Sequence, residues 1–155
     1  MILKLLCCFV LIFGGNMSTN TDSIFNHISN TNEIVVFDAG SKQSFQRGDD
    51  KFELILNAFL NTIKTANEMP AFGVSLDNET QQALKSGLWI EFCFDTTHSY
   101  NDMPFDSLLI SVNAEDSGIN LIRKHNHKYD GRCFYLNLKT NLKALSSIVC
   151  DLCKQ

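Results

Sequence analysis

The stretch from Leu88 to Leu138 constrains the fold more than any other part of the chain. It divides into four segments in which apolar and polar residues alternate, and turn residues separate the segments. The apolar side of the first segment holds Leu88, Ile90, Phe92 and Phe94. Its polar side holds Trp89, Glu91, Cys93 and Asp95. We predict an antiparallel meander of four strands with one apolar face, which needs another layer to cover it.

Two amphipathic segments can supply that layer. Residues 49–68 place apolar side chains at helical spacing from Phe52 to Ile63, and Pro70 ends the helix because it restricts the residue before it. Asp50 and Glu53 have the spacing of a capping box. Residues 140–152 carry a second apolar stripe. Both helices are expected to lie on the apolar face of the meander.

The remaining segments are shorter. Residues 33–38 are rich in β-branched residues and predict a strand, residues 71–76 predict another, and Asp77 or Asn78 then caps a short helix. The predicted fold is a two-layer α+β sandwich, in which a four-stranded antiparallel meander (about 88–138) and one or two short N-terminal strands are packed by helices about 49–68 and 140–152. The second face of the sheet is solvated, covered by residues 20–32, or a binding surface.

The first sixteen residues form an apolar N-terminal segment with one lysine. Three interpretations compete: a secretory signal, a lipid-attachment segment at Cys7 or Cys8, or an upstream sequence that is not translated because Met17 is the true start. Residues 17–155 are expected to form a single α+β domain. A start at Met17 predicts a cytoplasmic protein with reduced cysteines, and a genuine segment predicts a secreted or membrane-anchored one.

Charge is distributed unevenly along the chain. The net charge of −4 argues against non-specific binding to nucleic acid. Basic residues nevertheless gather around one predicted hairpin, at Arg123, Lys124, Lys128 and Arg132. Such a cluster suits an acidic partner, a phosphate or a membrane surface, and it is equally typical of a hairpin tip that keeps a protein soluble.

Metal binding has one weak candidate. His125 and His127 in the hairpin could join Cys150 and Cys153 as four zinc ligands. The order and spacing match no common zinc finger, and the two cysteines lie in the last turn of a predicted helix, where its dipole opposes a thiolate. We therefore expect neither a metal nor any other cofactor.

Catalytic candidates are similarly sparse. Cys93 or Cys133 could act as a nucleophile with His98 and Asp95, although small cysteines in strands are ordinarily half-buried packing residues. The common nucleotide-binding, zinc-protease and hydrolase motifs are absent from the sequence.

The sequence therefore predicts a non-enzymatic module that binds a protein partner. Its binding surface is expected on the polar sheet face around Trp89, Glu91 and Tyr135, or on the basic hairpin from Arg123 to Arg132. An envelope-associated or lipid-anchored protein and a small cysteine-dependent enzyme are the two alternatives.

Overall fold

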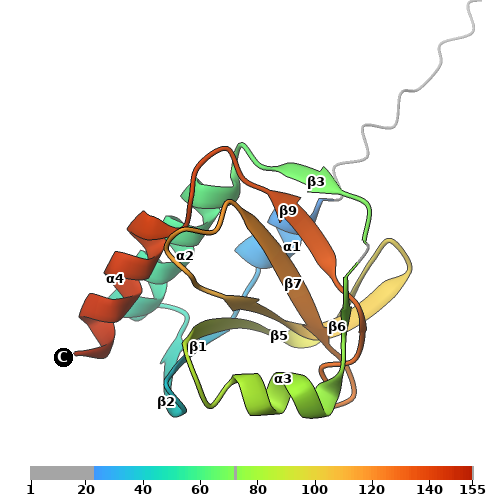
Figure 1. The fold of residues 1–155 in the computed structure, drawn as a ribbon, viewed down its shortest axis with the longest axis horizontal. Coiled ribbons are helices and arrows are strands. Elements are labelled where there is room, and N and C mark those ends of the chain that lie inside the picture. Colours follow the sequence, from blue (N-terminus) through green and yellow to red (C-terminus); the bar gives the residue numbers. More distant parts are fainter. Residues whose placement is uncertain (1–22, 72, 155) are drawn as a thin grey trace, which may run out of the picture.

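One antiparallel sheet of seven strands organises the computed structural model, which describes residues 23–71 and 73–154 (Figure 1). The strand order is β2-β1-β5-β6-β7-β9-β3. The bounds are β1 (Glu33–Asp38), β2 (Ser41–Gln46), β3 (Asn67–Met69), β5 (Leu88–Tyr100), β6 (Met103–Ser111), β7 (Gly118–Lys124) and β9 (Phe134–Asn137). Two further short strands, β4 (Val74–Ser75) and β8 (Gly131–Arg132), pair with each other. The helices are α1 (Ile24–Ser29), α2 (Asp50–Ile63), α3 (Asp77–Ala83) and α4 (Lys143–Cys153). The predicted α+β class is confirmed.

The centre of the sheet is the predicted meander. β5, β6, β7 and β9 are neighbours in that order and all pair antiparallel. The first hairpin is longer than predicted, because β5 continues past an irregularity between Cys93 and His98. Asn101 and Asp102 close it at φ of 49° and 59°, a conformation that Asn and Asp tolerate better than most residues. The hairpin therefore projects beyond the body of the sheet.

The N-terminal part of the sheet consists of two strands. β1 was predicted at its observed bounds, and it pairs with β2 on one side and β5 on the other. β2 was not predicted because only Phe45 of its six residues is buried. The turn between them uses positive φ at Ala39 and Gly40.

Helix α2 differs from its prediction at both ends. It ends at Ile63 rather than at residue 68, because Asn67–Met69 form the edge strand β3 against β9. The predicted capping box is wrong: the helix has no side-chain cap, and the Asp49 carboxylate instead accepts a hydrogen bond from the Gln46 N–H at 2.9 Å. The tertiary pairing of β3 therefore outweighs the local helical preference of its sequence.

The first face of the sheet, which carries Ile90 and Phe92, is covered by α1, α2 and α4. Figure 1 shows α2 and α4 side by side over this part of the sheet. Phe59 of α2 is fully buried, and its ring stacks on that of Phe92 with centroids 4.6 Å apart. Ile24 and Ile28 of α1 join the same core. One prediction was that residues 20–32 cover the opposite, second face of the sheet. That prediction is wrong for α1, which lies within this range and packs on the first face.

The second face, which carries Trp89, Leu109 and Ile122, is only partly covered. Leu84, just after α3, and Tyr129, from the loop between β7 and β8, pack on Leu109 in a small second core. The sheet therefore forms a two-layer sandwich with the helices on its first face, and an incomplete third layer lies on its second face.

The N-terminal segment lies outside the described residues, so the alternatives for residues 1–16 and the start at Met17 remain predictions. Within the described part of the chain, no helix is both long and apolar enough to cross a membrane.

Replacing Phe59 with alanine should lower the free energy of unfolding by about 3–5 kcal/mol, because it removes a fully buried ring and leaves a cavity. Leu54→Ala is the matched control on the same helix, since Leu54 is 47% exposed and its loss should cost less than about 0.5 kcal/mol. Urea denaturation followed by circular dichroism measures both. Equal losses would show that α2 is not packed on the sheet through Phe59.

Candidate functional site

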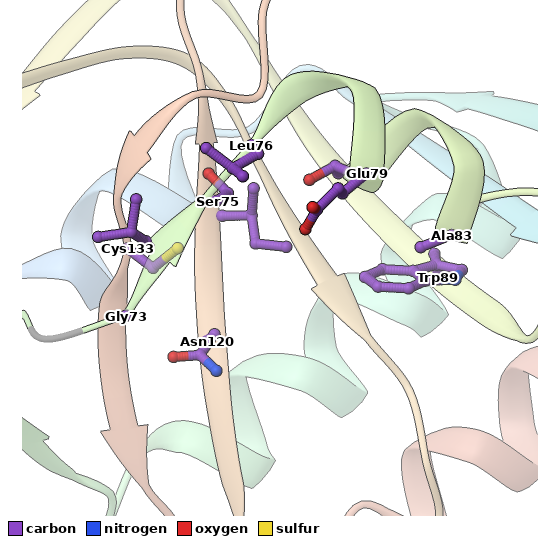
Figure 2. A pocket seen from close by; sticks show the side chains of 11 residues that line it. Gly73, Ser75, Leu76, Glu79, Ala83, Trp89, Asn120 and Cys133 are labelled. Atoms are coloured by element: carbon purple, nitrogen blue, oxygen red, sulfur yellow. The ribbon is translucent and has the colours of Figure 1, made fainter.

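The uncovered part of the second face forms a groove between β7 and the segment that runs from β4 into α3. Its central hollow has a volume of about 240 Å³ (Figure 2). Adjoining hollows of about 500 Å³ and about 150 Å³ each share residues with it. Leu76 and Glu79 are common to the first pair, and Trp89, Asn120 and Ile122 to the second. We call the three hollows together the second-face groove.

One wall of the groove is unusually apolar for a protein surface. Val74 is 66% exposed and Leu76 is 52% exposed. Met69, on the same edge segment, is 44% exposed, so this stretch holds three of the four exposed large apolar side chains among the described residues. Of the two β4 residues, Ser75 is buried, whereas the Val74 side chain is left without a covering layer. A cluster of this kind typically marks an interaction surface.

The opposite end of the central hollow is formed by Trp89, the only tryptophan in the sequence. Its indole N–H donates a 2.9 Å hydrogen bond to the Ser86 carbonyl, so the ring is held in place before any partner arrives. Trp89 was predicted as a binding residue, and the structure places it in the groove.

Acidic groups dominate the rim of the groove. Its lining residues include four carboxylates, Asp77, Glu79, Asp116 and Asp130, against one cation, Lys128, which gives a net charge of −3. The sequence predicted that Asp77 or Asn78 caps α3, but the helix has no side-chain cap. The Asp77 carboxylate instead accepts a hydrogen bond from the Tyr129 N–H at 2.8 Å. The carboxylate of Glu79 has no hydrogen bond or ion pair with any described residue.

Glu91, a second predicted binding residue, is not on an open surface. It is 3% exposed, and its carboxylate accepts hydrogen bonds from Ser107 at 2.5 Å and Lys124 at 3.2 Å. Tyr129 lies over this group, with the Lys124 ammonium 4.8 Å from its ring centre. Burial, followed by the charge of Glu91, raises the pKa of Tyr129, which therefore stays protonated. Glu91 belongs to the interior of the fold.

The basic hairpin is also largely used within the chain. Arg123 was expected to be exposed, but it is 9% exposed and donates to the carbonyls of Pro104 and Arg132. Lys124 is paired with Glu91. Lys128 and Arg132 remain on the surface. The predicted basic hairpin therefore presents fewer unpaired cations than its sequence indicates, since its two β7 cations bind acceptors inside the fold.

Tyr135 lies at the edge of the groove rather than in it. It pairs with Asn120 across β7 and β9, and its hydroxyl lies so close to Gly118 that a Cβ atom there would overlap it. Glycine at this position is therefore required by the close approach of the tyrosine.

The cysteine-based hypotheses gain no geometric support. Burial, followed by the charges of Glu91 and Glu33, raises the pKa of Cys93 to about 12, so its thiol is neutral near pH 7. The buried thiol of Cys133 also has a raised pKa, chiefly because of desolvation. Cys150 and Cys153 lie in α4, and burial raises the pKa of Cys153 as well.

The proposed zinc ligands do not come together. His125 lies 3.3 Å from Asp106 through its Nδ1 atom, and His127 occupies the hairpin turn at a φ of 66°. No group of three or more His, Cys, Asp or Glu side chains in residues 23–71 and 73–154 is arranged to hold a metal ion.

The structure also contains a histidine pair that no sequence pattern predicts. Nδ1 of His27 in α1 lies 2.9 Å from Nδ1 of His98 in β5, although the two residues are 71 positions apart. The rings of Phe94 and Phe105 pack against His98, and Tyr100 joins the cluster from the same strand. The pair holds α1 against the long β5–β6 hairpin.

Comparisons of the chain with protein-family models, curated protein sequences and solved structures gave no match.

The histidine pair should make stability depend on pH. Burial, followed by the charge of His27, lowers the pKa of His98 below its usual 6.5. The unfolded chain then binds more protons than the folded one below that pH, so stability is full above about 6.5 and falls as the pH drops towards the lowered value. Urea midpoints at pH 7.5 and 5.5 measure the loss.

The variant His98→Asn should show a smaller loss between these two values, and His127→Asn is the control, because His127 is exposed. Identical pH dependence in wild type and His98→Asn would contradict this assignment.

Proposed function

We propose that the chain is a non-enzymatic protein-interaction module, and that its second-face groove receives an extended segment of a partner protein. The observation that carries this proposal is the wall formed by Val74 and Leu76, which are 66% and 52% exposed beside three adjoining hollows. Covering such side chains removes apolar surface from water, which favours association by about 25 cal/mol for each Å² buried.

The shape of the groove favours a chain segment over a compact ligand. The central hollow shares lining residues with each of the other two, so the three hollows adjoin one another with the central one between. An extended peptide places side chains at regular intervals along such a row, so several shallow hollows can each receive one. A compact small molecule would fill one hollow and leave the others open.

The charge of the groove selects the kind of segment. A net charge of −3 over its lining residues favours a partner that combines apolar and basic side chains. For the basic hairpin, the sequence instead suggested an acidic partner, a phosphate or a membrane surface. The internal contacts of Arg123 and Lys124 leave that hairpin less able to attract one.

Catalysis has less support than binding. The thiol that lines the groove belongs to Cys133, which is 3% exposed and has a raised pKa. A neutral, buried thiol is a poor nucleophile. The groove therefore offers contacts and charge, and among its described residues it lacks an activated group.

Selection from a random-peptide library displayed on phage tests the proposal. Peptides enriched on the wild-type chain should contain apolar residues together with Lys or Arg, and they should bind Leu76→Ser about tenfold more weakly, because a partly exposed leucine is lost from the wall. Binding can be followed by the fluorescence of Trp89. Leu76 is the N-cap residue of α3, where serine is favoured, so the variant should remain folded.

The matched control is Leu54→Ser, which removes an exposed leucine from α2. It should bind the selected peptides as the wild type does. Failure to enrich any peptide, or equal affinity of wild type and Leu76→Ser, would overturn the proposal.

A further inference from the structure

The central hollow of the groove has the size of a site for one side chain. Its volume of about 240 Å³ lies below the roughly 300–1,000 Å³ of typical small-molecule sites. Exposed apolar residues and a fixed aromatic ring line it together, so a long side chain could lie along it with its stem against carbon atoms.

Figure 2 shows what a side chain would meet there. Trp89 lies at one end and Cys133 at the other, and the Glu79 carboxylate lies between Leu76 and Trp89. The Trp89 ring cannot turn freely, because its N–H is bonded to the Ser86 carbonyl. An aromatic ring beside a carboxylate is the combination that a guanidinium recognises, by stacking on the first and donating two parallel hydrogen bonds to the second.

The charge of Glu79 is not compensated within the described chain. No basic residue is among the eleven that line the hollow, and Lys128 reaches only the neighbouring one. Glu91 and Asp77, by contrast, are both occupied by partners inside the fold. Glu79 is therefore the acceptor that remains available to an incoming cation.

Asn120 adds a polar group to the floor of the hollow. Its side chain has space because residue 73 is glycine: a Cβ atom there would lie 3.0 Å from the Asn120 Oδ1 atom. Asn120 is exposed on β7 and lines the same hollow as Glu79, so its amide can make a further hydrogen bond there.

We infer that the central hollow is a specificity pocket for an arginine side chain of the partner segment, with Glu79 binding the guanidinium and Trp89 stacking on it. This inference rests on the proposed function and adds the residue type that the groove selects. Lysine shares the positive charge but lacks the planar fork, so it should bind less well.

The test uses three small probes on the full chain: the N-acetyl methylamides of arginine, lysine and norleucine. The chain has a single tryptophan, so its fluorescence and its one indole N–H resonance report on the hollow directly. The arginine probe should perturb both signals at lower concentration than the lysine probe, and norleucine should have the weakest effect.

Glu79→Gln should weaken the arginine probe by roughly tenfold and leave the norleucine probe unchanged, since it removes one charged hydrogen-bond acceptor. Glu53→Gln is the matched control, because it makes the same change in the first turn of α2, away from the groove. It should behave as the wild type.

Equal responses to the arginine and norleucine probes, or an unchanged arginine response in Glu79→Gln, would overturn the arginine pocket. Either result could occur while selected peptides still depend on Leu76, and the groove would then bind without this specificity. Loss of the Leu76 dependence would instead remove the proposed function itself.

Discussion

The buried carboxylate of Glu91 is the interaction on which the second face of this protein depends. A charge that is 3% exposed is costly unless it is paired and hydrogen-bonded, and here Lys124 and Ser107 provide both. Tyr129 covers the pair, and its backbone N–H binds Asp77 at the start of α3. One buried charge thus links β5, β7, the loop after β7 and α3.

The groove is a consequence of that arrangement. α3 and Tyr129 are drawn together over Leu109, so they cover the middle of the second face and leave β7 uncovered beyond them. On the first face, three helices pack across the sheet and bury the larger core. The first face therefore carries the larger hydrophobic core, whereas the groove on the second face exposes apolar side chains. The candidate function follows from this asymmetry.

Local pattern predicted much of this fold, and it failed where distant contacts decide the outcome. The alternation of apolar and polar residues correctly placed Trp89 and Glu91 on the same face of the sheet. It could not show that Tyr129 would bury Glu91 and that Trp89 would line a groove. The apolar residues of α2 fixed its packing face, whereas its end at Ile63 depends on pairing between β3 and β9. The groove itself was missed because its walls come from separate segments. The sequence signals for it were the predicted binding residue Trp89 and the apolar character of Val74 and Leu76.

A chemical-shift map of the wild-type chain, recorded as a library-selected peptide is added, shows whether the peptide binds in the second-face groove. We expect the shifts to concentrate at residues 74–80 and 120–122, together with the indole N–H of Trp89. Shifts concentrated on α2 and α4, or on the hairpin from Arg123 to Arg132, with the Trp89 signal unmoved, would contradict it.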